Sequence, residues 1–391
     1  MKRLSTIFIL ALFTINSFHL FSQVSFSGIL DSSVSFQAGA GDSPDFSYGI
    51  EEYANLRMMA SLRDRALVYG SINLIAAAGN YAAYAKEMAS LGTGSPLSST
   101  SFVTGDSYIA AIELERLYFR INGDFADFDG GLFRIPFGYS QVWGPSDFLN
   151  PKNPLKPDAR PRAVLGLGLS LYPLDSVKML LFTATARDPF LRTGNGTITG
   201  FSIDKHWDRA SVQALYSFEV QKEGPRWGIF RAGLSVKADV EIGLVMDALY
   251  TYSSEANTGL DGLSLSMGAD YSFFNGDLIV IAEYLYNGET SSTALGYGGE
   301  FSNNNYLYTS LTWRFNDYTN ASLALISGLD DVSFTPVITL NHDLFQGATL
   351  TLSAQIPLDR DVFTGNGKRG ELGPMLPGYY ALLTTGLKMR F

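Results

Sequence analysis

Residues 240–250 read VEIGLVMDALY, and residues 263–273 read LSLSMGADYSF. In both stretches apolar side chains occupy every second position, and small or polar side chains fill most of the positions between them. An extended strand points successive side chains to opposite faces, so this period of two predicts strands with one apolar and one polar face. Such a run of about ten residues is the length that a tilted strand needs to cross a bilayer.

The same alternation recurs from residue 24 onward, and the connections between the runs follow a rhythm. Short connections such as NGDFAD (122–127) take turns with mostly longer ones such as residues 79–105 and 287–304. Tight turns at one end and long loops at the other are typical of an outer-membrane barrel, whose turns face the periplasm. We count eighteen candidate strands, which begin near residues 24, 48, 66, 106, 126, 162, 176, 198, 209, 226, 240, 261, 277, 305, 319, 332, 347 and 378.

We therefore predict an all-β protein, a transmembrane antiparallel up-and-down β-barrel of eighteen strands, with sixteen as the alternative count. A soluble β-sandwich would also alternate, but nothing in that fold requires loops that take turns between short and long. A closed sheet also removes the unpaired edges that lipid would not tolerate. After the N-terminus no apolar run approaches the roughly 20 residues of a membrane-spanning helix, which argues against a helical membrane protein.

The composition narrows the class further. The chain has no cysteine, which excludes disulfides and thiolate metal sites. Its formal net charge of −10 makes nucleic acid a poor partner. The 39 glycines and the 48 tyrosines and phenylalanines (21 + 27) suit many strands joined by glycine-rich turns.

The first residues are typical of a secretory signal peptide. Lys2 and Arg3 precede a short apolar run from Leu4 to Leu12. We expect residues 1–22 to be this signal, although no small-x-small pattern marks the cleavage site. No linker or charge run divides the remainder, so residues 23–391 are expected to form one outer-membrane barrel domain of a Gram-negative envelope.

Three short motifs resemble Gram-negative outer-membrane porins. The strand GLKMRF (386–391) ends in Phe391, which resembles the C-terminal aromatic signal that the barrel-assembly machinery reads in such proteins. GLFRIPFGYSQVW (131–143) is similar to a stretch of phosphate-selective porins of the O/P type, and GPSDFLNPKNP (144–154) to a loop in some of those barrels. The resemblance implies a porin-like barrel with outer-membrane lipid and the assembly machinery as partners, and it carries over no substrate.

Residues 138–162 form the third external loop by the connection count. In porins the third loop commonly folds into the barrel and narrows the pore, so the resemblance implies the same role here. Several prolines restrict the backbone of this loop, and Trp143 and Phe148 could anchor it on a wall. Fixed charges act strongly on ions in a narrow passage. We expect an anion preference because the basic residues of the loop exceed the acidic ones by two: Lys152, Lys156, Arg160 and Arg162 against Asp147 and Asp158.

The period of two also assigns charges of both signs to the lumen wall. They would either set up a field across the pore or pair with one another. The basic ones are Arg57, Arg120, Arg134, Arg231 and Arg314, and the acidic ones are Glu113, Glu219, Glu241, Asp247, Asp270 and Glu283.

Two further patterns concern the wall itself. Between Ile112 and Leu117 the alternation changes parity, which predicts a β-bulge near Glu115 and Arg116. Aromatic residues near strand ends are expected at the membrane–water boundary: Tyr250, Tyr252, Tyr271, Phe273, Tyr284, Tyr286, Tyr306 and Trp313.

Signals for catalysis are nearly absent. His206 and His342 lie in predicted turns, and neither has a second histidine at metal-ligand spacing. We therefore predict no enzyme, cofactor or metal, but a porin for passive diffusion of small hydrophilic solutes. Two alternatives stay open: a surface adhesin or structural protein with a blocked lumen, and a transporter of hydrophobic substrates, which the charged wall disfavours. The sequence fixes neither the solute nor the choice between monomer and homotrimer.

Overall fold

The structure is a computed structural model of the chain. It describes residues 22–39, 46–62, 65–79, 101–105, 107–152, 161, 163–185, 196–221, 228–253, 259–288, 303–360, 370–373 and 379–391.

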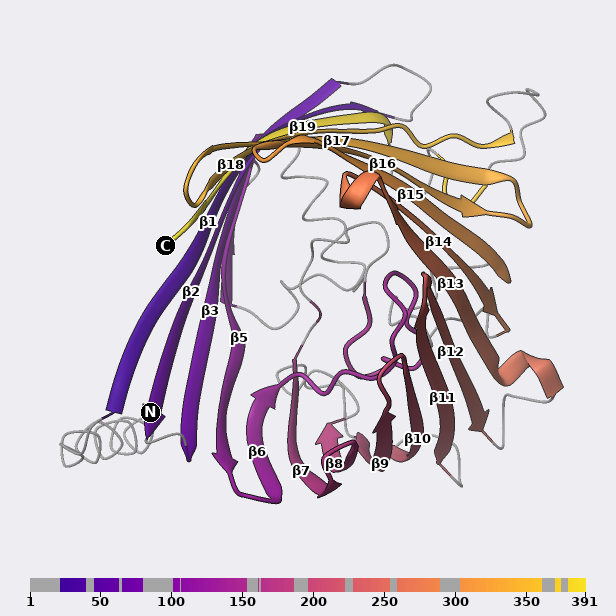
Figure 1. The fold of residues 1–391 in the computed structure, drawn as a ribbon. Helices are drawn as coiled ribbons and strands as arrows, with labels where there is room; N and C mark the ends of the chain where they lie inside the picture. The colour runs from indigo at the N-terminus through magenta and orange to yellow at the C-terminus, as the bar shows by residue number, and fades with distance from the viewer. Residues whose placement is uncertain are drawn as a thin grey trace.

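Strands make up most of the described residues, and they surround one central space (Figure 1). The two 3₁₀ helices among these residues are short turns, η2 (Gly259–Gly262) and η3 (Phe274–Gly276), and no helix here is long and apolar enough to cross a membrane. The strands are β1 (Ser22–Gly39), β2 (Phe46–Leu62), β3 (Ala66–Gly79), β4 (Ser101–Thr104), β5 (Tyr108–Asn122), β6 (Ala126–Phe133), β7 (Val164–Leu174), β8 (Val177–Thr185), β9 (Gly196–His206), β10 (Ala210–Gln221), β11 (Ile229–Val240), β12 (Ile242–Ser253), β13 (Leu263–Phe273), β14 (Leu278–Asn287), β15 (Asn305–Asn316), β16 (Thr319–Gly328), β17 (Ser333–Phe345), β18 (Ala348–Gln355) and β19 (Tyr379–Arg390).

The sheet closes on itself through its first and last strands. From β5 onward each strand pairs antiparallel with the next one, and β1 pairs with both β2 and β19. The seam runs from Ile29 opposite Arg390 to Gly39 opposite Tyr379. Next to the Ile29–Arg390 end of the seam, the backbone of Gly28 exchanges two hydrogen bonds with that of Phe391, of 2.8 and 3.1 Å. The closed antiparallel barrel predicted from the alternation is thereby confirmed.

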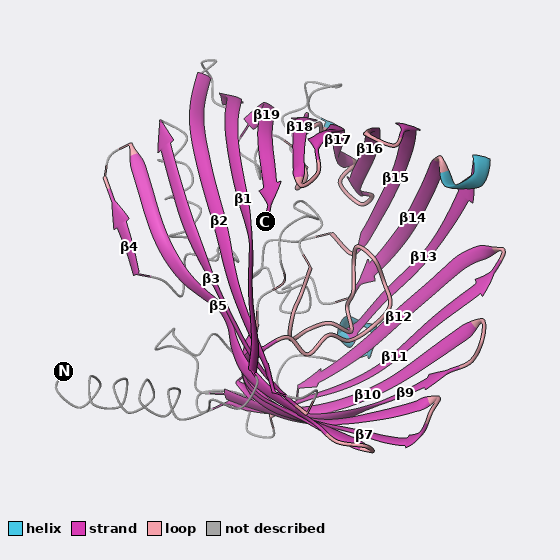
Figure 2. Cartoon of the chain, turned by 60° about the vertical axis from the view of Figure 1, so that its left-hand side comes forward, coloured by secondary structure: helices cyan, strands magenta, loops and turns pink. Residues whose placement is uncertain are grey.

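The short strand β4 does not add a member to the wall. It pairs only with residues 109–112 of β5, on the edge opposite β3, and β6 pairs with residues 117–122 of β5. Figure 2 shows β4 beside one end of β5. Eighteen strands therefore form the barrel, as predicted, and the largest difference in a starting residue is three, at β11, predicted near 226 and found at Ile229.

Side chains alternate between the two faces as the period of two predicts. On β12, Leu244 and Tyr250 are exposed on the outer face, whereas Asp247 and Leu249 are buried inside. One predicted boundary residue was wrong: Tyr306 is fully buried on the inner face. The reason is parity, since Tyr306 falls on the inner face of β15 and Trp313 on its outer face.

The predicted bulge lies in β5. Ser71 of β3 is opposite Arg116, and the next residue, Ile72, is opposite Leu114, so Glu115 is the extra residue. An extra residue reverses the parity of all that follows. Glu115 and Arg116, although consecutive, both reach polar partners on the inner face.

Candidate functional site

Residues 134–152, here called the inner loop, leave the end of β6 and cross the interior of the barrel (Figure 1). Phe133, Ile135 and Phe137 keep the alternation of a strand and are buried. Full burial of such a side chain stabilises by about 1.5–3 kcal/mol, which favours the docked loop over one in water. The wall residues that form one apolar cluster with them are Phe182, Ala184, Ile198, Leu215 and Leu249.

Beyond Phe137 the inner loop is held by polar side chains of strands β10 and β12. Gly138 donates its backbone N–H to Gln213 (2.7 Å), and the amides of Tyr139 and Ser140 donate to the Asp247 carboxylate at 2.9 Å each. Gly138 has a φ of +80°, and a Cβ there would lie 2.3 Å from an oxygen of Asp247. Only glycine therefore fits this position without strain.

The next three amides converge on a second carboxylate. Glu283 of β14 accepts the backbone N–H groups of Gln141 (3.0 Å), Val142 (3.1 Å) and Trp143 (2.6 Å), and the Ser266 hydroxyl as well (3.0 Å). A buried carboxylate is costly unless it is hydrogen-bonded, and a buried amide needs an acceptor. The carboxylate and the amides satisfy each other's hydrogen-bonding capacity. The wall carboxylates thus accept the loop amides as the carbonyl groups of a neighbouring strand would.

The second half of the inner loop folds back under the first. Asn150 accepts the Ile135 amide through its side-chain oxygen (2.7 Å), and the Lys152 ammonium donates to the Ser140 carbonyl. Phe148 stacks on Phe137 with ring centroids 5.9 Å apart. The loop is therefore a compact double layer.

Asp147, at the turn of this double layer, is almost fully buried. Its carboxylate accepts the backbone amide of Phe137 at 3.3 Å. Burial raises the pKa of Asp147 from 3.8 to about 7, and Lys152 and the amide bonds oppose this shift only in part. The group is thus poised to change its charge near neutral pH.

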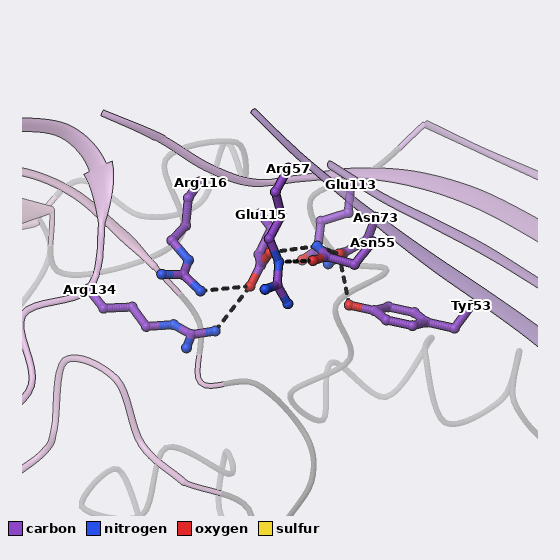
Figure 3. Close-up of polar contacts among 8 residues, drawn as sticks. All are labelled: Tyr53, Asn55, Arg57, Asn73, Glu113, Glu115, Arg116 and Arg134. Atoms are coloured by element: carbon purple, nitrogen blue, oxygen red, sulfur yellow. Dashed lines mark hydrogen bonds and ion pairs between the residues drawn. The ribbon is translucent and has the colours of Figure 1, made fainter. Parts of the chain in front are cut away.

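Arginines occupy the side of the lumen that faces these anchors. Arg57 lies on β2, Arg116 on β5 and Arg134 in the inner loop, and we call these three the arginine cluster (Figure 3). In Figure 1, β2, β3 and β5 lie across the barrel from β12, β13 and β14. Asp247 and Glu283 therefore lie on the wall opposite the strands that carry Arg57 and Arg116.

A polar network holds the arginine cluster in place. Glu115 accepts Arg116 at 3.3 Å, Arg134 at 3.2 Å and Asn55 at 2.8 Å. Arg57 donates to Asn55 at 2.5 Å.

Behind this layer lies a second set of polar groups. Asn73 donates to Glu113 (2.7 Å) and accepts Tyr53 (2.8 Å). Three arginines meet two glutamates, Glu113 and Glu115, so the group carries a net charge of +1 (3 − 2). The Nε atoms of Arg116 and Arg134 have no hydrogen-bond partner among the described residues.

The other predicted wall residues are distributed around the barrel. Arg120 pairs with Asp129 (2.7 Å), Arg231 with Glu219 (2.7 Å), and Arg314 with Asp277 (2.8 Å) in the turn that holds η3. Arg231 also lies over the Phe148 ring, 4.9 Å from its centroid.

Asp270 and Glu241, two acids predicted for the lumen wall, lie in different parts of the structure. Asp270 accepts the Gln141 side chain at 3.2 Å and so adds to the hold on the inner loop. Glu241 is not in the wall: it lies between β11 and β12 with a φ of +77°. The predicted run began at Val240 and included Glu241, because the apolar alternation of Val240, Ile242 and Leu244 continues across the turn.

Part of the predicted loop charge lies outside the described residues. Lys152 and Asp147 are placed by the structure, whereas Lys156, Asp158, Arg160 and Arg162 are not among the residues that it describes. Sequence reasoning missed Arg116 and Glu115 as lumen residues. The parity change that revealed the bulge was the available signal, because it moves both side chains inward.

The two histidines considered for metal binding lie near turns, apart from this site. His206 is 2.9 Å from the Ser211 hydroxyl, and His342 is 2.9 Å from that of Thr319. Within the described part of the chain no group of acids and histidines is arranged to hold a metal ion.

Comparisons with known proteins agree with the barrel. No family model matches the sequence, and no curated protein matches it. Among solved structures, OccAB4 of Acinetobacter baumannii has a TM-score of 0.57 at 9% identity, covering 94% of this chain and 98% of that one. OccK2 (OpdF) of Pseudomonas aeruginosa, solved in complex with glucuronate, has a TM-score of 0.58 at 7% identity, with coverage of 94% and 98%.

A BenF-like porin from Pseudomonas fluorescens Pf-5 is similar to the same degree, with a TM-score of 0.58, 7% identity and coverage of 94% and 98%. At such low identity the likeness speaks for the fold alone. The similarity of residues 131–154 to O/P-type porins stays a prediction. The chain thus has the fold of these proteins, a closed antiparallel β-barrel of eighteen strands of the outer-membrane type.

Proposed function

We propose that this chain is an outer-membrane channel for passive diffusion of small hydrophilic solutes, narrowed by its inner loop. The observation that carries the proposal is the set of hydrogen bonds that attaches this loop to the wall. Five consecutive backbone amides, from Tyr139 to Trp143, end on two buried carboxylates, Asp247 and Glu283. A loop attached in this way holds one position across the lumen and sets the width of the path beside it.

The same arrangement supports a preference for anions. Asp247 and Glu283 are covered by the inner loop, with 0% and 1% of their surface exposed. The side chain of Arg116 on the facing wall is 23% exposed, and that of Arg134, which reaches Glu115 of the same wall from the inner loop, is 22% exposed. A passing solute therefore meets guanidinium groups more than carboxylates. In a narrow passage with little screening, such an imbalance attracts anions and repels cations.

A carboxylate is the anionic group that best fits this wall. Guanidinium groups bind carboxylates through paired hydrogen bonds, and the guanidinium side chains of Arg116 and Arg134 are partly exposed. OccK2 was solved with glucuronate, a small sugar acid. We extend the proposal to small hydrophilic solutes that carry one carboxylate.

The basic residues of loop 138–162 keep their proposed share in selectivity. Lys152 is bonded to Ser140, so it stabilises the inner loop as well as adding charge. Replacing Lys152, Lys156, Arg160 and Arg162 together by serine is expected to shift the reversal potential toward cation preference. An unchanged reversal potential would reject this loop as a selectivity filter.

The remaining proposals concern delivery to the membrane. We propose that residues 1–22 act as the secretion signal, that residues 23–391 form one barrel domain in outer-membrane lipid, and that the barrel-assembly machinery reads Phe391. A truncation that begins at residue 23 should accumulate in the cytoplasm, and export of that protein would reject the signal.

Reconstitution of the purified barrel tests the proposed function. In planar bilayers we expect ohmic steps, and in a salt gradient a reversal potential on the anion side. In liposome swelling, glucuronate should enter faster than a cationic amino sugar of similar size. A folded barrel that conducts nothing and passes neither solute would reject the channel and favour an anchor or adhesin with a blocked lumen.

A further inference from the structure

The tip of the inner loop lies in a pocket that two distant parts of the chain build together. Trp143 is 2% exposed, its ring lies 5.5 Å from that of Tyr306, and its indole N–H donates to the Glu283 carbonyl at 3.2 Å. One member of the same apolar cluster, Leu372, comes from a segment 229 residues further along the chain (372 − 143). The other members are Leu285, Tyr308 and Ile326 of the wall.

Leu372 belongs to residues 370–373, here called the brace, which lie between β18 and β19. It is 0% exposed. Its backbone N–H donates to the Ser333 hydroxyl at 2.9 Å, and its carbonyl accepts the Thr335 hydroxyl at 2.8 Å. Because both backbone groups find partners on β17, the brace can be buried without an unpaired polar group.

Glu371 links the brace to Tyr306, whose ring packs on Trp143. Its carboxylate accepts the Tyr306 hydroxyl at 2.8 Å and the Asn303 side chain at 2.6 Å. Its backbone N–H donates to Asp331 at 2.5 Å. Tyr306 therefore contacts the inner loop with its ring and the brace with its hydroxyl.

The seat of the brace contains local strain. Val332, between Asp331 and Ser333, has a φ of +57°. This conformation is a true outlier for a β-branched residue, and it persists only when its surroundings enforce it. Its two neighbours supply the acceptors for Glu371 and Leu372. At Gly370 a Cβ would lie 2.5 Å from Ser333, so the brace approaches β17 too closely for any other residue.

From these contacts we infer that the brace is a positioning element for the inner loop: Leu372 and Glu371 fix Trp143 through Tyr306, so the brace helps to set the width of the pore. The inference rests on the proposed channel. Asp247 and Glu283 hold the backbone of the loop, and the brace adds the apolar cover of its tip. Loss of that cover leaves the tip free to leave the wall.

The test uses the absence of native cysteine to follow the loop directly. Ser140 is 1% exposed, so a Ser140→Cys variant carries one shielded thiol in the inner loop. We expect slow reaction with a bilayer-impermeant maleimide, and faster reaction once Leu372→Ala is added. Single-channel conductance and open-channel noise should rise with the same change. Leu352→Ala is the matched control, because Leu352 is 46% exposed on the outer face of β18.

A double-variant comparison separates positioning from general damage. Trp143→Ala should raise conductance and noise, and Leu372→Ala added to it should have little further effect, because both remove members of the same apolar cluster. Where Leu372→Ala prevents assembly, Glu371→Gln and Tyr306→Phe carry the test with the same expected direction. Retention of the fold is checked by heat-modifiable migration on gels.

The outcomes distinguish the brace from the channel. Labelling that rises in a barrel without conductance supports the brace and rejects the proposed function. A conducting barrel in which Leu372→Ala and Glu371→Gln change neither labelling nor conductance overturns the brace and leaves the channel standing.

Discussion

The Glu283 carboxylate of β14 lies 2.6 Å from the backbone nitrogen of Trp143, at the tip of a loop that starts on β6. The same carboxylate accepts two further amides of that loop. A wall residue expected to act on passing ions is therefore an anchor for the element that narrows the path.

The anchor predicts what its loss should do. Glu283→Ala leaves three amides of the inner loop without this acceptor, and an unpaired buried polar group such as the Trp143 amide costs about 1–3 kcal/mol. The inner loop should leave the wall, so conductance should rise and the heat-modifiable transition should move to lower temperature. Glu283→Gln, which keeps one carbonyl oxygen, should have the smaller effect, and equal conductance of both variants and the parent would contradict the anchor.

Glycine at position 138 is a second requirement of the same seat. Gly138→Ala places a Cβ 2.3 Å from Asp247 at a φ of +80°. We expect a loosened loop, seen as higher open-channel noise in single-channel recordings. Gly144→Ala is the matched control six residues away (144 − 138), where a Cβ would meet only Asp147 at 3.7 Å. Identical noise in the two variants would count against strain at Gly138.

The arginine cluster predicts ion selectivity. Replacing Arg57, Arg116 and Arg134 by glutamine removes three positive charges from the side of the lumen that faces the anchors. The reversal potential in a potassium chloride gradient should move toward cation preference. Arg314→Gln serves as the control. Arg314 pairs with Asp277 near a turn, and both side chains are about half exposed, so this substitution should leave selectivity unchanged. A shift in the control of about one third of that size, in proportion to the charge removed, would mean that net charge alone matters.

Asp147 predicts a dependence on pH. Its folded-state pKa of about 7 lies above its ordinary value of 3.8, so the docked loop favours the protonated acid. Docking is then strongest at low pH and weakens as pH rises from about 4 to about 7. Open-channel noise should be lower at pH 5 than at pH 8. Asp147→Asn should remove this difference, and an Asn variant that keeps the full pH dependence would assign it to another group.

The barrel seam gives a prediction about assembly. The Phe391 ring lies against Gly28, where a Cβ would be 2.4 Å from the ring. Gly28→Val or deletion of Phe391 should therefore slow closure of the sheet and reduce the heat-modifiable form. Gly70→Ala is the control, with ordinary contact to Leu117 at 3.7 Å. Normal assembly of both seam variants would exclude a role for this contact.

Much of the fold follows from local pattern. A period of two fixes which side chains share a face, and turn residues fix where strands end, so the strands and the bulge at Glu115 were predictable. Trp143 and Phe148 were also predicted as anchors of the loop on a wall: Trp143 packs on Tyr306 of β15, whereas Phe148 stacks on Phe137 of the loop itself.

The pattern could not supply how deep in the wall each side chain lies or which residues it contacts. The period gives a face, but the height of Asp247 or Glu283 in the wall depends on the stagger of all strands around the barrel. Their burial also depends on a loop whose path is set by tertiary contacts. Tyr306 was misplaced for a similar reason, because an aromatic near a strand end suits either a lipid boundary or a packed inner loop.

Single-channel recording of the parent barrel beside a variant with Asp247→Ala and Glu283→Ala tests the central claim most directly. The account predicts ohmic steps for the parent and larger, noisier steps for the variant, because five amides lose their acceptors. Equal step sizes in two folded barrels, or a parent without any conductance, would contradict the account.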